Sequence, residues 1–172
     1  MNRFEDKVVI VTGAAGGIGR AAALRFGAEG AAVVAVDLDD DGLAGTVAAV
    51  AAAGGTAHAV RADVTQSGDV EAYVQTAVDR FGGVDVLFNN AGIEGVVSPL
   101  EDYPEDVFDN VMAVNVKGVW LGMRHVRDLP GIGRRLVHKR RLAHRGWRVG
   151  SRLNGSHPDV HRNQTFGSFS AN

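Results

Sequence analysis

The run KVVIVTG at residues 7–13 constrains the fold of this chain more than any other stretch of its sequence. Its apolar residues are consecutive, without the polar alternation of a strand that faces water, and a turn signal ends the run. Such a run is typical of a parallel strand that is covered on both faces. Further strand-like runs occur at residues 31–37, 56–64 and 84–92. We therefore expect a buried parallel sheet.

Helical patterns lie between and after these runs, with apolar residues at helical spacing. The predicted helices cover residues 16–30, 41–55, 67–83 and 104–126. Asp40 is the expected cap of the second helix, Ser67 or Asp69 lies near the cap of the third, and the fourth is expected to bend near Gly118. Because strands and helices alternate with short connections, the sequence predicts the α/β class and a doubly wound parallel sheet.

The turn after the first strand is rich in glycine and opens the first helix. Gly13, Gly17 and Gly19 let the chain turn tightly and approach a ligand closely, and a helix N-terminus there favours a phosphate. The spacing differs from the G-x-G-x-x-G fingerprint, and an ordinary glycine-rich turn is the alternative. Asp37 ends the second strand 18 residues after Gly19, where a ribose-binding carboxylate belongs. This combination favours a nucleotide site.

Five motifs in register extend this interpretation. They are TGAAGGIG at 12–19, Asp37, ADV at 62–64, NNAG at 89–92 and Asn115. With these motifs, residues 4–126 resemble the short-chain dehydrogenase/reductase family. The resemblance implies a Rossmann-type sheet and an NAD(P)-dependent oxidoreductase, which moves a hydride between the nicotinamide and an alcohol or ketone.

The resemblance also assigns cofactor contacts by position. Gly13, Gly17, Ile18 and Gly19 are implied to line the pyrophosphate, and Asp37 to accept hydrogen bonds from the adenosine ribose. A carboxylate at this position repels a 2′-phosphate, and no arginine follows it in DLDDDG. We therefore expect NAD as the cofactor, with NADP as the less favoured alternative.

The remaining motif residues complete the implied site, and each has a simpler structural explanation. Asp63 and Val64 match positions that meet the adenine, although Asp63 could be only a turn residue. Asn90 matches an asparagine beside the cofactor, or it satisfies turn backbone. Asn115 matches the helix asparagine that holds a water in the proton relay, or it is a hydrogen-bonded polar group on an apolar helix face.

The serine, tyrosine and lysine of the family's chemistry have no match in this sequence. The family tyrosine is the acid/base, and a lysine four positions later lowers its pKa. Tyr73 and Tyr103 are the two tyrosines here, and Ala77 and Val107 stand four positions after them. We therefore expect a chain that is inactive as written, in which Asn115 alone remains of the catalytic group. A non-catalytic dinucleotide-binding module is the alternative function.

The composition changes near residue 126. Residues 1–124 hold 8 Lys and Arg against 18 Asp and Glu, whereas residues 125–172 hold 10 against 2. This break predicts a dinucleotide-binding domain over residues 1–126 and a basic tail, disordered or poorly packed, over residues 127–172. The sheet is then expected to be incomplete, with residues 84–88 as an apolar edge and with marginal stability.

We interpret this tail with the hypothesis of a reading-frame shift that begins near residues 126–133. Permitted codons for VHRNQTF (160–166), read one base later, encode Tyr-Thr-Ala-Thr-Lys-His, which contains the family's Tyr-x-x-x-Lys. The same shift turns VHKRRL (137–142) into Ser-Thr-Asn-Ala-Ala-Ser, which is close to the family's serine segment. The alternative is that RRLVHKRRLAHRGWR (134–148) contacts the phosphates of a nucleic acid.

Composition argues against several other classes of protein. The chain has no cysteine for a disulfide framework or a thiolate metal site. His157 and His161 have helical metal-ligand spacing, but Pro158 lies between them, so no metal is expected. No run approaches the roughly 20 apolar residues that cross a bilayer. We expect a cytoplasmic location and a small alcohol or ketone as the substrate of intact relatives, while the family's usual homo-oligomer is in question here.

Overall fold

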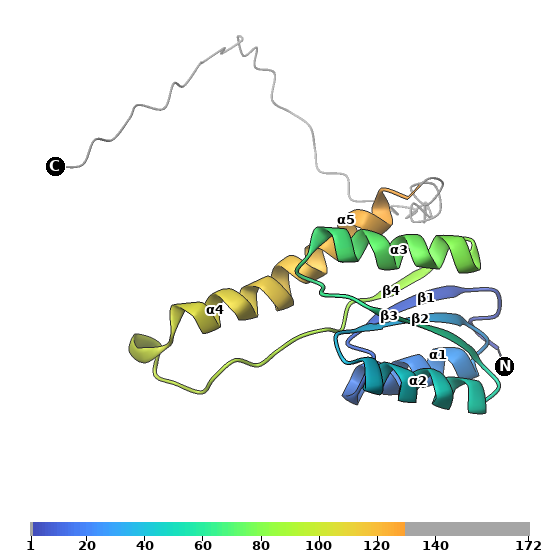
Figure 1. Ribbon diagram of the computed structural model, residues 1–172, viewed down its shortest axis with the longest axis horizontal. Coiled ribbons are helices and arrows are strands. Elements are labelled where there is room, and N and C mark those ends of the chain that lie inside the picture. Colours follow the sequence, from blue (N-terminus) through green and yellow to red (C-terminus); the bar gives the residue numbers. More distant parts are fainter. Residues whose placement is uncertain (1, 130–172) are drawn as a thin grey trace, which may run out of the picture. The chain divides into compact units, whose positions relative to one another are not determined.

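The computed structural model describes residues 2–129, and the predicted alternation of strands and helices is confirmed there. Successive strands are joined by helices that return the chain to the same edge of the sheet (Figure 1). The strands are β1 (Val8–Thr12), β2 (Ala32–Asp37), β3 (Thr56–Arg61) and β4 (Val86–Phe88). The helices are α1 (Gly17–Ala28), α2 (Asp40–Ala52), α3 (Ser67–Phe81), α4 (Glu105–Met112) and α5 (Val119–Arg127).

The described strands form one parallel sheet in the order β3-β2-β1-β4. In its register, Ile10 of β1 pairs with Val34 of β2 on one side and with Leu87 of β4 on the other. The chain moves outward from β1 to β2 and β3, and then returns to the other side of β1. This change of direction places a topological switch point between β1 and β4, the usual ligand-binding position in such sheets.

Helices cover both faces of the sheet, with α1 and α2 on one face and α3 and α5 on the other (Figure 1). Alternate residues of β1 therefore enter two different apolar clusters. Val8 and Ile10 lie in the cluster that contains Tyr73 of α3, whereas Val9 and Val11 lie in the cluster that contains Leu43 of α2. This double coverage explains why the strand shows no polar alternation.

The cap of α2 differs from the sequence-based prediction. Asp39, and not Asp40, precedes the helix in extended backbone, and its Oδ1 accepts a hydrogen bond from the Gly42 amide at 3.1 Å. The prediction was wrong by one position because three consecutive aspartates offer equivalent caps. Before α3, Gln66 occupies the capping position without a side-chain cap, and Ser67 and Asp69 lie in the first turn, near the cap as predicted.

The predicted long helix runs from Glu105 to Arg127, but it is not regular throughout. A π-helical segment, Ala113–Gly118, lies between α4 and α5, and Gly118 itself keeps helical dihedral angles. A Cβ atom at Gly118 would lie 2.9 Å from Val64 Cγ2. The glycine predicted to bend the helix thus lets the helix pass close to the loop after β3.

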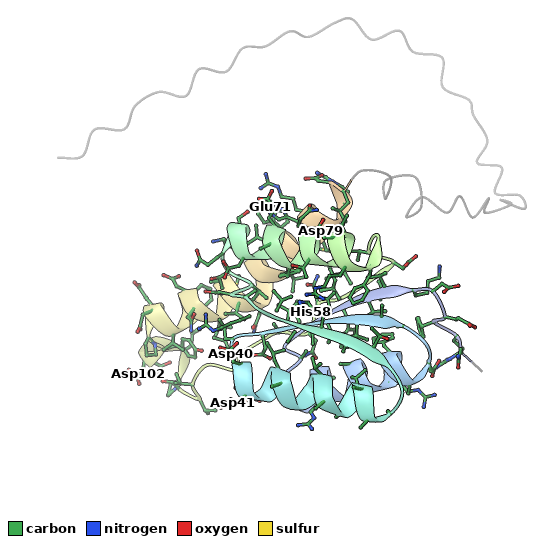
Figure 2. The ribbon with its side chains drawn as sticks, turned by 45° about the vertical axis from the view of Figure 1, so that its right-hand side comes forward. Asp40, Asp41, His58, Glu71, Asp79 and Asp102 are labelled. Carbon is green, nitrogen blue, oxygen red and sulfur yellow. The ribbon has the colours of Figure 1, made fainter. Side chains whose placement is uncertain are left out.

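Charged side chains mark the outside of the layers. Asp40 and Asp41 are exposed at the start of α2, and Glu71 and Asp79 are exposed on α3 (Figure 2). Within residues 2–129, none of the helices is both long enough and apolar enough to span a bilayer.

Candidate cofactor-binding site

A cavity of about 550 Å³ opens at the carboxyl ends of the described strands. It is lined by the turn after β1, the ends of β2 and β3, and the loop after β4. Seven of the nine predicted site residues line this cavity, and Gly19 and Asn115 do not. The fold therefore brings together side chains and turns that are separated by up to 77 residues in the sequence, from Gly13 to Asn90.

The glycine turn packs closely against Asn90 and against its own backbone. Gly13 and Gly17 have φ angles of 68° and 50°, in the left-handed region that favours glycine. A Cβ atom on Gly13 would lie 2.8 Å from Asn90 Nδ2, and one on Gly19 would lie 1.9 Å from the Gly13 carbonyl oxygen. Gly19 thus lies against the turn and lets α1 approach it, while Gly13 and Gly17 line the cavity.

The first turn of α1 offers backbone donors at this cavity. The helix begins at Gly17, and the preceding Gly16 makes no side-chain capping bond. The first N–H groups of a helix have no partner within the helix, so an anion can bind them. Ile18 stands in the same turn with 73% of its surface exposed, and it also lines the cavity.

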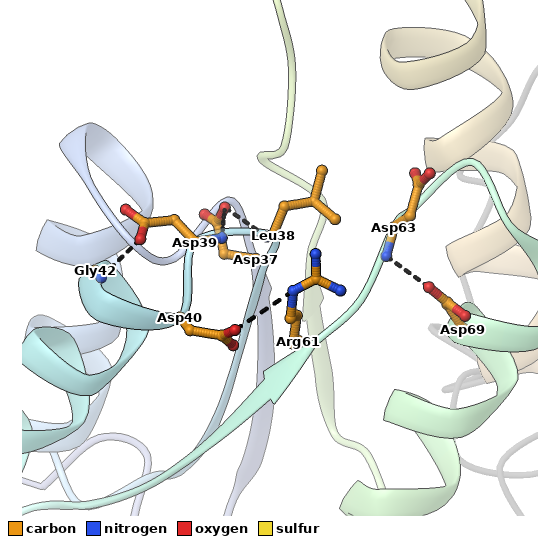
Figure 3. Close-up of polar contacts among 8 residues, drawn as sticks. All are labelled: Asp37, Leu38, Asp39, Asp40, Gly42, Arg61, Asp63 and Asp69. Atoms are coloured by element: carbon orange, nitrogen blue, oxygen red, sulfur yellow. Dashed lines mark hydrogen bonds and ion pairs between the residues drawn. The ribbon is translucent and has the colours of Figure 1, made fainter.

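Asp37 ties the glycine turn to the end of β2. Its Oδ2 accepts a hydrogen bond from the Ala15 amide at 2.9 Å, and its Oδ1 accepts from the Leu38 and Asp39 amides at 2.7 and 3.3 Å. Figure 3 shows the latter contacts at the end of the strand. A carboxylate has about four lone-pair sites, so these bonds orient Asp37 and leave acceptor capacity for a ligand hydroxyl.

Asp63 and Val64 line the cavity in the loop after β3. Asp63 Oδ1 accepts from the Thr65 amide at 2.8 Å. The Asp63 amide donates to Asp69 Oδ2 at 2.9 Å, a contact that Figure 3 shows. Partial burial raises the pKa of Asp63, but hydrogen bonds from Thr65 and Gln66 and the charge of Lys117 outweigh it. The net pKa of Asp63 is therefore lowered, and the carboxyl is ionised at neutral pH.

Asn90 connects β4 with β1 through Thr12. The Asn90 and Ala91 amides donate to Thr12 Oγ1 at 3.0 and 3.1 Å, and Asn90 Nδ2 donates to the Thr12 carbonyl at 3.0 Å. Sequence reasoning missed Thr12, which is buried. A polar residue that ends an otherwise apolar strand beside a glycine turn was the available signal. The contacts hold the two strand ends together at the switch point.

Asn115 lies in the π-helical segment and binds the loop after β4. Its Oδ1 accepts from the Ile93 amide and its Nδ2 donates to the Ile93 carbonyl, both at 2.9 Å. Ile93 and Val114 line the cavity, whereas Asn115 does not. Because π-helical segments are frequent at functional sites, this distortion of the helix is itself a feature of interest.

Neither tyrosine lies at the cavity. Tyr73 is fully buried in α3, and its hydroxyl has no hydrogen-bond partner among residues 2–129. Burial raises the pKa of Tyr73 to about 12. Tyr103 follows the 3₁₀ turn Leu100–Asp102 and does not line the cavity. Neither tyrosine hydroxyl is therefore part of the cavity lining.

Several sequence-based hypotheses fall outside residues 2–129. The basic segment 134–148, the pair His157 and His161, and both segments that support a frame shift lie there. The domain boundary near residue 126 and the character of the tail therefore stay predictions. Within the described part of the chain, no group of three acidic or histidine side chains comes together to hold a metal ion.

Known proteins resemble this chain over about three quarters of its length. A family model described as short chain dehydrogenase matches residues 7–130. Levodione reductase from Leifsonia aquatica is 44% identical over 126 residues, which are 72% of this chain and 47% of that protein. 3beta-Hydroxysteroid dehydrogenase 1 from Eggerthella lenta is 44% identical over 136 residues, 75% of this chain and 52% of that protein. The chain thus spans about half the length of these curated relatives.

Solved structures agree with the described fold. The crystal structure of levodione reductase matches with a TM-score of 0.70 at 44% identity, over 72% of this chain and 49% of that one. The structure of NAD+-bound xylitol dehydrogenase also gives 0.70, at 40% identity, over 72% of this chain and 48% of that one. With a family model that covers most of its length, the chain belongs to the short-chain dehydrogenase family of oxidoreductases.

Proposed function

We propose that this chain binds NAD in the cavity at the carboxyl edge of its sheet. The observation that supports the proposal is the glycine turn, with Gly13, Gly17 and Gly19, which forms a cradle beside Asp37. A Cβ atom at Gly13 would collide with Asn90, and one at Gly19 would collide with the Gly13 carbonyl, so neither position has room for a side chain. The uncapped amides of α1 open beside this turn. Such a cradle suits a pyrophosphate, and an oriented carboxylate suits the adjoining ribose. The NAD+-bound state of a structural relative supports the assignment.

Asp37 has the central part in this proposal. Three backbone amides fix its carboxylate, and its remaining lone pair accepts a hydrogen bond from an adenosine ribose hydroxyl. A 2′-phosphate at the same place would set like charges side by side, which costs several kcal/mol. We therefore propose NAD and not NADP as the preferred cofactor.

The other site residues complete the binding surface. We assign Asp63 and Val64 to the adenine end of the cavity, and Asn90 to the wall beside the glycine turn. Asn115 is a positioning residue that fixes Ile93 through both amide atoms. Its remaining N–H and lone pair are free to hold a water in the proton relay.

The chemistry that follows from this site is hydride transfer. When bound, the nicotinamide supplies or accepts the hydride that an alcohol or ketone exchanges with it. The chain's own part in such a reaction is to orient the dinucleotide and to move a proton to or from the substrate oxygen. Because neither Tyr73 nor Tyr103 lines the cavity, we propose that this chain binds the cofactor without turning over substrate.

Calorimetric titration of the full chain with NAD+ and NADH tests the binding proposal. We expect a dissociation constant between about 1 μM and 1 mM, the range in which enzymes commonly bind substrates. Asp37→Asn keeps one side-chain oxygen but removes the charge, and it should weaken NAD+ binding by about ten-fold, since charged hydrogen bonds contribute most. A folded chain that ignores millimolar NADH would overturn the proposal.

Two further assays separate the rival functions. A panel of secondary alcohols with NAD+ should give no rate above background, and measurable turnover would show that residues outside the described range supply an acid/base. Binding to arbitrary DNA that weakens steeply with salt would favour the basic-tail alternative. Dinucleotide binding without either result is the expected outcome.

A further inference from the structure

We propose that Asp40 and Arg61 form a second determinant of cofactor choice, in which Asp40 withholds the Arg61 guanidinium from the 2′-phosphate of NADP. The inference rests on the proposed NAD site and deepens it. It assigns a part in cofactor specificity to an ion pair that includes neither Asp37 nor any residue of the glycine turn.

The sheet register places Arg61 beside the ribose carboxylate. Arg61 is the last residue of β3 and pairs with Asp37, the last residue of β2. Parallel strands lie about 4.8 Å apart, so the Arg61 side chain starts one strand away from Asp37 at the same edge of the sheet. An arginine close to this carboxylate position is the kind of group that accommodates a 2′-phosphate in dinucleotide-binding folds.

In this chain a different partner holds that arginine. Arg61 Nε lies 3.4 Å from Asp40 Oδ2, and Figure 3 shows the Arg61 side chain meeting Asp40 at the start of α2. Asp39 caps the helix, so the Asp40 carboxylate is not needed for the cap and can pair with Arg61. The sequence hides this arrangement, because Arg61 stands 24 positions after Asp37 and not directly behind it.

The ion pair is weak enough to compete with a ligand. The side chains of Arg61 and Asp40 are 62% and 71% exposed. Exposed pairs of this kind contribute roughly 0.2–1 kcal/mol, whereas a guanidinium binds phosphate through two parallel hydrogen bonds. Removal of the Asp40 charge therefore frees the Arg61 guanidinium to bind a phosphate. In the unaltered chain, Asp40 neutralises this guanidinium while NAD is bound.

Matched single and double variants test this inference by calorimetry with NAD+ and NADP+. Asp40→Asn should raise the affinity for NADP+ relative to NAD+ by about three-fold, the scale of an exposed ion pair. Asp41→Asn is the control, since it removes the same charge from the same helical turn and Asp41 makes no ion pair with Arg61 among the described residues. Arg61→Gln added to Asp40→Asn should cancel the gain.

The same comparison in an Asp37→Asn background should give a larger gain, because the direct repulsion of the 2′-phosphate is gone. This background also keeps the test valid when NADP+ binds the original site too weakly to measure. Circular dichroism and thermal melts confirm that each variant is folded. An equal gain in Asp40→Asn and Asp41→Asn, or a gain that survives Arg61→Gln, would assign the effect to net charge and overturn the inference. Failure of the unaltered chain to bind NAD+ would instead refute the proposed function.

Discussion

Strands β1 and β4 are neighbours in one sheet, and both come from apolar runs, yet they are buried very differently. Every residue of β1 is at most 6% exposed. Every residue of β4 is partly exposed, and the strand is three residues long. Among the described strands, β1 has a neighbour on each side, whereas β4 pairs with β1 alone. An apolar run therefore shows that a strand can be buried, and its neighbours decide whether it is.

The helices extend this contrast. On one face α3 buries Val70, Tyr73, Val74 and Ala77 against the sheet. The long helix from α4 to α5 instead leaves a series of large apolar side chains exposed in the described structure, namely Phe108, Met112, Val116, Trp120 and Met123. The region around β1 is thus closely packed, and the region of β4 and the long helix is open.

The largest expected effect compares the two strands directly. Ile10 of β1 is fully buried, so Ile10→Ala should lower the free energy of unfolding by about 2–5 kcal/mol. Leu87, its partner in β4, is partly exposed, and Leu87→Ala should cost about half as much. Urea denaturation measures both. Equal losses would show that β4 is as well covered in solution as β1, and the contrast would not hold.

A second comparison tests the close packing of the glycine turn. Gly19→Ala places a Cβ atom 1.9 Å from the Gly13 carbonyl, and it should cost about 1–3 kcal/mol of stability and abolish NAD+ binding. Gly68→Ala is the control, since Gly68 also lies in a first helical turn but has nothing within 4 Å of a new Cβ atom. The control should retain stability and binding. Undiminished NAD+ binding by Gly19→Ala would mean that the turn is looser than described.

Acid should loosen the closely packed region through Glu29. Hydrogen bonds from Arg3, opposed by burial and aided by the charge of Arg25, lower the pKa of Glu29 from 4.5 to about 2. A lowered pKa in the folded state adds stability above pH 4.5 that is lost as the pH falls toward 2. The effect should be modest because both arginines are mostly exposed. Thermal melts across this range should show the loss, and Glu29→Gln should remove this part of the pH dependence.

The smallest expected effect lies in the open region. Met123 is 55% exposed, so Met123→Ala should change the free energy of unfolding by no more than about 0.5 kcal/mol. Denaturation at several protein concentrations is the measurement. A loss of stability well above 1 kcal/mol would show that this helix face is covered in solution. If the loss also depends on protein concentration, another copy of the chain covers the face. The closely packed and open regions would then differ in whether they pack within one chain or between chains.

Much of the candidate site followed from short-range sequence patterns. A glycine turn between a strand and a helix, and an aspartate at the end of the next strand, are local features with a known physical purpose. Thr12, the Asp39 cap and the contact of Asn115 with Ile93 did not follow, because each depends on which backbone group lies opposite the side chain. The part of Arg61 likewise becomes visible only in the register of β3 with β2.

The sequence by itself determined the order of strands and helices, the position of the glycine turn and the family, because hydrophobic periodicity and glycine conformation act over a few neighbouring residues. The tertiary structure decided which apolar strand is buried on both faces, where the long helix widens into a π-helical segment, and which acidic side chain meets Arg61. These outcomes depend on contacts between segments far apart in the chain, and local patterns contain no information about the distance between such segments.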